Sequence, residues 1–177
     1  MRWFWVDRFT EYVAGVRATA EKGVSLSDDF IHDHWEGYPV MPNTLIAEGM
    51  AQTSGLLVSE LYGFQELVVL AKFTKLEFDG LVLPGQQLTY KAQIGHRKEV
   101  GAQASVTATV DGRRQAAAEI FFARLQNDSG PESGLPDRLF DPDDLCHWLH
   151  ITGVFRVGKR EDGSPMKPAD YGLPVYG

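Results

Sequence analysis

Alternating apolar and polar residues predict several β-strands in this chain. Between residues 13 and 26, Val16, Ala18 and Ala20 fall on one side and charged or hydroxyl-bearing residues on the other. This period of two is typical of a strand with one buried face. Four further strands are expected at 67–78, 86–95, 99–110 and 114–124. The second and third alternate most regularly, through the apolar sets Leu88, Tyr90, Ala92 and Ile94, and Val100, Ala102, Ala104, Val106, Ala108 and Val110.

The dipeptide Asp111-Gly112 separates the last two expected strands. A two-residue turn between strands needs positive backbone φ angles, which aspartate and glycine adopt at low cost. We therefore expect these two strands to form an antiparallel hairpin.

Residues 44–61 have a different pattern, with apolar positions on most faces of a helix and no proline. Such a segment is typical of a helix that is buried on nearly every side, and Asn43 or Thr44 is its expected N-cap. Gly49 and Gly55 would each lower helix stability by up to about 1 kcal/mol relative to alanine. We therefore expect a neighbouring element, such as a sheet wrapped around the helix, to pack closely against the backbone there.

One buried helix followed by antiparallel strands predicts an α+β fold, in which a curved antiparallel sheet wraps around a long central helix. We assign residues 1–125 to this domain. The next segment, QNDSGPESGLPD, is typical of a linker, and residues 126–177 form a C-terminal extension. In the extension we expect one short helix, DPDDLCHWLH, with Asp141 as N-cap and Pro142 in the first turn, and otherwise an irregular tail.

Composition and charge exclude several classes of protein. The formal net charge is −7 and the 17 lysines and arginines are scattered, so the positive stripe of a nucleic-acid-binding protein is absent. No apolar run approaches the roughly 18 residues of a membrane span, and Asp7 and Glu11 lie where a signal peptide would be apolar. The single cysteine, Cys146, excludes an intrachain disulfide. We expect a cytoplasmic protein with no nucleic-acid or membrane partner.

The strongest functional signal lies in residues 32–52, HDHWEGYPVMPNTLIAEGMAQ. A loop with His32 and His34 leads through two prolines into the expected helix, which carries Glu48. A carboxyl group within an apolar helix is either partnered at a wet edge or part of a functional site. The rest of the motif decides between these two interpretations.

This motif resembles the signature of the 3-hydroxyacyl-(acyl carrier protein) dehydratases of dissociated fatty-acid synthesis, which reads approximately H-F-P-G-x-P-x-M-P-G-x-L-x-x-E-A-x-A-Q. From His34 to Gln52 the present chain reads H-W-E-G-Y-P-V-M-P-N-T-L-I-A-E-G-M-A-Q, without a gap. Other segments between residues 6 and 125 are similar to the family as well. The resemblance implies a hot-dog fold that works as a homodimer, or as a hexamer built as a trimer of dimers.

The resemblance assigns the catalytic roles to His34 and Glu48, with each site built from the histidine of one subunit and the glutamate of the other. Dehydration removes a proton from C2 and a hydroxyl from C3, so two acid–base groups must reach adjacent carbons. An imidazole changes protonation near neutral pH, which suits His34 as the base. A carboxyl group in apolar surroundings tends to hold a proton, which suits Glu48 as the acid.

Other site residues follow from the same motif. The resemblance implies that the backbone N–H at Asn43 binds the thioester oxygen, where the start of the helix also provides a positive dipole end. Gln52 lies one helical turn after Glu48 and is expected to orient its carboxyl group. The residues expected along the substrate tunnel are Tyr38, Pro39, Met41 and Pro42.

The expected substrate is a 3-hydroxyacyl thioester of acyl carrier protein or of coenzyme A, with no cofactor and no metal. Asp79-Gly80 stands where relatives have a basic residue and a proline, which leaves the carrier open. The spacings of His32 and His34, and of His147 and His150 in the extension, could hold a metal, but the sequence places no further cluster of ligands beside either pair.

Three other functions remain as alternatives on this fold. A hot-dog thioesterase would use a carboxylate to activate water, without the histidine-to-glutamate motif. A dehydratase that also isomerises the new double bond typically carries aspartate where Glu48 stands. A non-catalytic acyl-thioester-binding domain is the third, because Glu36, Asn43 and Gly49 depart from the family's proline, glycine and alanine. The presence of both His34 and Glu48 favours simple dehydration.

Overall fold

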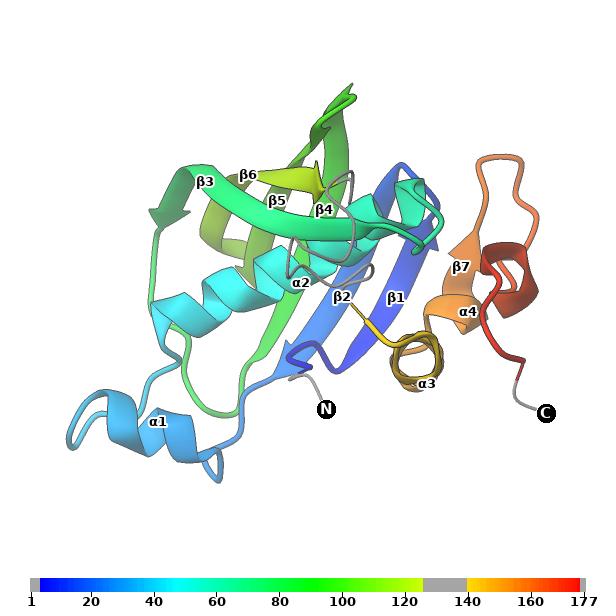
Figure 1. Cartoon of the computed structure of the whole chain (residues 1–177). Helices are drawn as coiled ribbons and strands as arrows, with labels where there is room; N and C mark the ends of the chain where they lie inside the picture. Colours follow the sequence, from blue (N-terminus) through cyan, green and yellow to red (C-terminus); the bar gives the residue numbers. More distant parts are fainter. Residues whose placement is uncertain (1–3, 126–139, 176–177) are drawn as a thin grey trace, which may run out of the picture.

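The computed structural model describes residues 4–125 and 140–175. A seven-stranded sheet curves around the long helix α2 (Asn43–Leu61), which packs against strands β2 to β6 (Figure 1). This arrangement confirms the α+β class and the hot-dog architecture expected from the sequence. The strands are β1 (Arg8–Val13), β2 (Arg17–Gly23), β3 (Leu67–Phe78), β4 (Gln87–Lys98), β5 (Gly101–Val110), β6 (Arg113–Leu125) and β7 (Gly158–Lys159).

The strands follow the order β3-β6-β5-β4-β2-β1-β7 and are antiparallel except for the pair β1 and β7. The hairpin between β5 and β6 is confirmed, because Asp111 and Gly112 have φ angles of 49° and 76°. Both residues therefore have the left-handed backbone conformation that a tight two-residue turn between twisted strands requires. The four strands predicted between residues 67 and 124 correspond to β3, β4, β5 and β6.

The prediction of a single strand at 13–26 is wrong in its extent. The structure has a hairpin instead, in which β1 ends at Val13 and β2 starts at Arg17. The pairing register of β1 shifts between Phe9 and Glu11, and its two fully buried aromatic residues, Phe9 and Tyr12, are three positions apart. Because an irregularity breaks the period of two, alternation alone does not reveal this strand.

The prediction that Val100 belongs to the buried set is also wrong. β4 continues to Lys98 and β5 begins at Gly101, so Val100 lies in the turn between them and is 62% exposed. The remaining members of that set, from Ala102 to Val110, are buried. Alternation therefore predicts the buried face correctly but places the start of this strand too early.

Helix α2 begins at Asn43, and its N-cap is Pro42, which makes no side-chain capping bond. The expectation that Asn43 or Thr44 caps the helix is therefore wrong. The expected close approach at the glycines is confirmed. A Cβ added at Gly49 would lie 2.6 Å from Cε2 of Tyr90 in β4, and one added at Gly55 would lie 3.1 Å from Cε1 of Phe122 in β6.

The segment between β2 and α2, expected to be a loop, contains the short helix α1 (Asp29–His34). Ile31 is fully buried, and the ring of Phe30 packs edge-on against Trp5 at a centroid distance of 5.0 Å. Figure 1 shows α1 projecting beyond the N-terminal end of α2. The two apolar residues anchor this helix and leave its histidines exposed.

The predicted helix of the C-terminal extension is confirmed as α3 (Pro142–Ile151), with the Asp141 side chain accepting hydrogen bonds from Asp143 N and Asp144 N. The tail after it is not irregular as expected. It forms α4 (Val154–Val157), strand β7, which pairs in parallel with β1, and a 3-10 helix at Pro168–Tyr171. The predicted linker lies entirely outside the described residues, and the division into 1–125 and 126–177 stays a prediction. No helix among residues 4–125 and 140–175 is long and apolar enough to cross a membrane.

The tail is tied to the end of α2 by a hydrogen bond of 2.9 Å from the Tyr171 hydroxyl to Glu60. Burial raises the pKa of Glu60, although the bond from Tyr171 and the charges of Arg97 and Arg160 act in the opposite direction. A carboxyl group whose pKa is raised on folding stabilises the fold below its unfolded pKa and loses this contribution as pH rises through the raised value.

We therefore expect Glu60→Gln, which imitates the protonated acid, to flatten this part of the pH dependence. Urea unfolding of the wild type and of the variant, at neutral and at mildly acidic pH, measures how the free energy of unfolding depends on pH in each protein. The free energy of unfolding of the wild type should increase relative to that of the variant as the pH is lowered. An unchanged difference between the two proteins would contradict the assignment.

Candidate active site

Glu48 lies half-buried on α2, at the junction of two hollows between this helix and β3. One hollow, of about 320 Å³, extends toward the start of the helix and is lined by Asn43, Thr44, Ala47, Leu70, Phe73, Leu76 and Phe78. The other, of about 310 Å³, follows α2 toward its C-terminal half. Glu48, Ala51 and Leu70 line both. The Glu48 side chain thus borders largely apolar hollows on two sides.

The Glu48 carboxyl group accepts a hydrogen bond from Gln52, one helical turn further on, and the role of this contact in catalysis stays a prediction. Gln52 Nε2 donates to Glu48 Oε1 at 2.7 Å, and Gln52 Oε1 accepts from the backbone N–H of Trp5 at 2.7 Å. A backbone N–H can only donate, so it fixes which end of the amide faces Glu48.

Asn43 is the first residue of α2 and lines the same hollow as Glu48. The N–H groups of Leu45 and Ile46 both bond to the Pro42 carbonyl. Within the described residues, those of Asn43 and Thr44 have no acceptor. The first N–H groups of a helix lack intrahelical partners and carry its positive dipole end. Asn43 is not among the residues with positive φ, so asparagine fits this position without strain.

His34 is the last residue of α1 and is exposed. In the described part of one chain, no hydrogen bond or ion pair joins it to Glu48, and it lines neither hollow. Of the expected tunnel residues, Tyr38 is 49% exposed, Pro39 is half-buried, and Met41 and Pro42 are buried. None of the four lines the two hollows. Their role in the tunnel stays a prediction.

Strand β3 is an edge of the sheet that has no strand partner on its outer side within the described residues. Its register against β6 shifts twice, and Leu70 and Leu76 are 41% and 38% exposed. Unpaired edges normally carry bulges or charges that prevent pairing with other chains. Strand β3 has both features, in its register shifts and in the exposed Lys72 and Lys75. The exposed Leu70 and Leu76 nevertheless line the hollow beside Glu48, so this part of the edge is suited to contact with another apolar surface.

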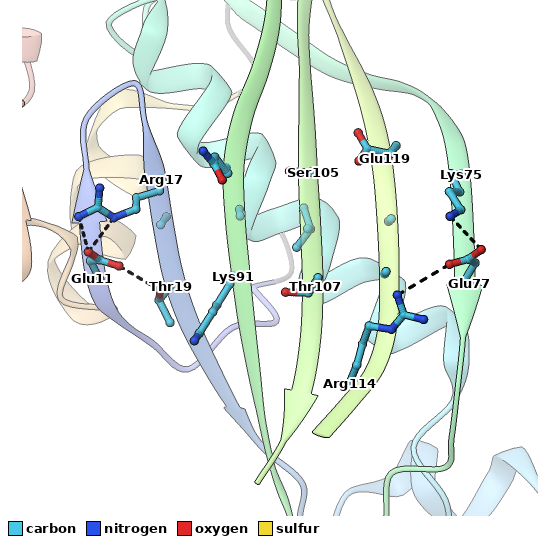
Figure 2. A pocket seen from close by; sticks show the side chains of 16 residues that line it. Glu11, Arg17, Thr19, Lys75, Glu77, Lys91, Ser105, Thr107, Arg114 and Glu119 are labelled. Atoms are coloured by element: carbon cyan, nitrogen blue, oxygen red, sulfur yellow. Dashed lines mark hydrogen bonds and ion pairs between the residues drawn. The ribbon is translucent and has the colours of Figure 1, made fainter. Parts of the chain in front are cut away.

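A larger hollow, of about 460 Å³, lies on the opposite face of the sheet (Figure 2). Its side chains include Thr19, Lys91, Ser105, Thr107 and Glu119, which alternate with residues that face α2. Charged residues at both of its sides are already paired, Arg17 with Glu11 at 2.9 Å and Lys75 with Glu77 at 3.0 Å. No residue of the motif borders this hollow, and we do not place the chemistry there.

No group of three or more histidine, cysteine or acidic side chains that could hold a metal occurs within residues 4–125 and 140–175. His32 is two residues from His34 on the same helix and bonds to the Leu26 carbonyl through Nε2 at 2.6 Å. The ring of His150 packs against Phe155 at 5.9 Å. In the part of the chain that the structure describes, neither histidine pair belongs to a group of three such side chains, the number of protein ligands that a metal site normally needs.

The sequence interpretation missed several residues of the site. Phe4, Phe140 and Trp148 line the hollow that runs along α2, and Trp5 positions Gln52 through its backbone. Two of these residues belong to the extension, outside the segments that resemble the dehydratases. Trp148 on the apolar face of a capped helix, and Phe140 just before the N-cap Asp141, were a signal for docking, but the sequence does not say against what.

Comparison with known proteins identifies the family. The model of the FabA-like domain matches residues 4–119. The 3-hydroxyacyl-(acyl-carrier-protein) dehydratase FabZ of Listeria welshimeri is 37% identical over 119 residues, which cover 67% of this chain and 83% of that protein. FabZ of Ruminiclostridium cellulolyticum is 38% identical over 119 residues, which cover 67% of this chain and 84% of that protein.

Solved structures support the fold at lower sequence identity. AziG of S. sahachiroi aligns with a TM-score of 0.57 and 18% identity, over 67% of this chain and 90% of that chain. The protein smu.793 of Streptococcus mutans, solved bound to acetyl CoA, aligns with a TM-score of 0.57 and 17% identity, over 71% and 93% of the two chains. From the matches in sequence, we conclude that the chain belongs to the FabA-like family of 3-hydroxyacyl-(acyl-carrier-protein) dehydratases, which are hydro-lyases.

Proposed function

We propose that this protein dehydrates 3-hydroxyacyl thioesters of acyl carrier protein to trans-2-enoyl thioesters in cytoplasmic fatty-acid synthesis, with His34 as base and Glu48 as acid. The observation that carries the proposal is the Glu48 carboxyl group, fixed by Gln52 at the junction of two apolar hollows. It belongs to the ungapped motif that begins at His34. The relatives named above supply the substrate class.

In the proposed reaction, the His34 imidazole takes a proton from C2 of the substrate. The electron pair left on C2 is stabilised by the thioester, whose oxygen gains negative charge and accepts a hydrogen bond from the backbone N–H of Asn43. The C3–O bond then breaks, and the hydroxyl leaves as water with a proton from Glu48. The products are the 2-enoyl thioester and water, and the protonated histidine and the glutamate carboxylate must exchange the proton to complete the cycle.

We propose that each site combines His34 of one subunit with Glu48 of the other. Two features support this arrangement. His34 is exposed on a helix that projects from its own domain and makes no bond to Glu48 in the described chain. Glu48 lies beside the unpaired edge of β3, with exposed Leu70 and Leu76 next to it. A second copy that covers this edge would bury the leucines and could bring its α1 to the hollow.

Gln52 is a positioning residue in this scheme, and Gln52→Ala tests it. Hydrogen bonds to charged groups contribute about 1.5–3 kcal/mol, so we expect kcat to fall by roughly 10- to 100-fold. The pH profile of kcat should also change, because the environment of the Glu48 carboxyl group changes. Loss of folded protein alone would lower the active fraction without moving the profile. An unaltered profile would contradict the positioning role.

The proposed function itself is tested by mixing the purified protein with 3-hydroxyacyl or trans-2-enoyl thioesters on acyl carrier protein and on coenzyme A. Absorbance of the enoyl thioester and release of free thiol are followed in parallel. Interconversion without thiol release is the expected result. Thiol release would show a thioesterase instead, and no reaction with either carrier would favour a domain that only binds acyl thioesters.

A further inference from the structure

The hollow that runs along α2 from Glu48 has the shape and lining of an acyl-chain site. Its helix-side residues are spaced by three or four positions, so they form one stripe on α2, and the opposite wall comes from the start of β3 and from Phe122. The helix-side residues are Glu48, Ala51, Gln52, Gly55, Leu56 and Ser59. Apart from the polar end at Glu48 and Gln52 and the hydroxyl of Ser59, the helix side is apolar or small. This is the chemistry that holds a hydrocarbon tail attached to a reacting head.

The outer wall of this hollow comes from the C-terminal extension. Phe140 and Trp148 line it together with Phe4, and the ring of Phe4 stacks on Trp148 at a centroid distance of 4.1 Å. The ring of Phe140 packs against Trp148 as well, at a centroid distance of 5.8 Å. The family model ends at residue 119. Phe140 and Trp148 therefore come from a part of the chain outside the matched domain, whereas Phe4 is the first residue that the family model matches.

The wall is held in place from several directions. Trp148 is only 4% exposed, and Leu145 and Leu149 of the same helix are buried in the core. The carbonyl of Thr152, at the end of α3, accepts a hydrogen bond from Phe9 N in β1 at 2.7 Å, and β7 extends the sheet beside β1. A helix fixed by both its apolar face and the sheet cannot move aside at low cost to admit a larger ligand.

The dimensions of the hollow limit the length of the tail. From Glu48 to Ser59 the stripe spans eleven residues, or about 16 Å at a rise of about 1.5 Å per residue. An extended chain advances roughly 1.2 Å per bond, since three backbone bonds span at most about 3.6 Å. The stripe therefore matches a tail of up to about thirteen carbons, and the volume of about 310 Å³ lies at the lower end of the range for ligand sites.

We propose that the C-terminal extension determines the length of the acyl chain that the enzyme accepts, with Trp148 and Phe140 as the wall that excludes long tails. This inference rests on the proposed function. The ligand is the hydrocarbon tail of the thioester. Its head lies at Glu48 and its tail follows α2 beneath Trp148. Short and medium tails fit the hollow, and longer ones exceed the space that Trp148 and Phe140 enclose against α2.

The test compares chain-length profiles. The rates of dehydration are measured for a series of 3-hydroxyacyl thioesters of increasing length with the wild type, Trp148→Ala and Phe140→Ala. The ratio of kcat/KM for a long substrate to that for a short one should increase at least tenfold in Trp148→Ala and by less in Phe140→Ala. Both kcat/KM values of a variant are measured on the same preparation, so a lower fraction of folded enzyme reduces both equally and leaves their ratio unchanged. Phe140 is half-buried, so its variant serves if Trp148→Ala does not fold.

Ile151→Ala is the matched control. Ile151 belongs to the same helix, is 67% exposed and lines neither hollow, so its truncation should leave the profile unchanged. Binding of saturated acyl thioesters of the same lengths, measured by calorimetry, gives a readout without turnover. If the wild type binds these ligands but dehydrates no substrate, the proposed function fails while the wall can still be tested. Identical length profiles in the wild type and in both wall variants would overturn the inference.

Discussion

Replacing His34 by alanine, or Glu48 by glutamine, should lower kcat by about 10²- to 10⁴-fold, the usual contribution of a positioned acid or base. His34 is exposed and Glu48 is half-buried, so neither change removes a core contact. Glutamine also keeps an oxygen that can accept the bond from Gln52. Thermal melting and the elution volume of the native protein should match the wild type, while the enoyl absorbance changes slowly or not at all. A normal rate in either variant would remove that residue from the catalytic pair.

Mixing these two inactive variants tests whether the site is shared between subunits. In a mixed dimer, one site would combine both substitutions, and the other would combine an intact His34 with an intact Glu48 from different chains. Random exchange should therefore restore about a quarter of the wild-type activity for a two-fold symmetric dimer. A site contained in one chain would remain inactive in every combination. Light scattering on the mixture provides the control that dimers are present.

The fold could be predicted where local patterns have one physical interpretation. Asp111-Gly112 requires a tight turn whatever its surroundings, and the buried alternation from Ala102 to Val110 specifies one face of a sheet. The hairpin of β1 and β2 could not be predicted in this way, because a register shift in β1 removes its period of two. The capping of α2 was mispredicted for a related reason: the helix begins directly after Pro42, and a polar side chain near a helix start does not by itself indicate capping.

The site was predictable only in its local part. Glu48 and Gln52 are four residues apart on one helix, so their hydrogen bond follows from helical geometry. By contrast, Trp148 reaches the same hollow from about one hundred positions further along the chain, through a tail that has no counterpart in the motif. Sequence spacing cannot give such a contact, because it depends on how α3 docks against Phe4 and the sheet. If two chains build each site, the distance between His34 and Glu48 likewise depends on how the two chains dock, and sequence spacing cannot give it.

Gly49→Ala should destabilise the protein, although alanine is the family's usual residue there and the better helix former. The exchange gains up to about 1 kcal/mol in helix propensity. The new Cβ would overlap the ring of Tyr90, which is fully buried and cannot swing into solvent. Overpacking of a filled core costs typically about 1–3 kcal/mol. The steric cost therefore exceeds the gain, and urea unfolding should show a lower free energy of unfolding.

Two further variants show whether Tyr90 is the cause. Gly55→Ala makes the same exchange in the same helix, but its Cβ would meet Phe122 at 3.1 Å, a contact that a small shift relieves, so we expect little change in stability. Tyr90→Leu removes the obstructing ring. The double variant Gly49→Ala with Tyr90→Leu should therefore lose less free energy of unfolding than the two single variants lose when their losses are added. Contacting residues typically couple by about 0.5–3 kcal/mol in such a cycle. Strict additivity would mean that a contact other than Tyr90 decides the effect of Gly49→Ala on stability. A favourable coupling would show that Gly49, beside Glu48 on α2, and the large Tyr90 ring on β4 form one packing unit.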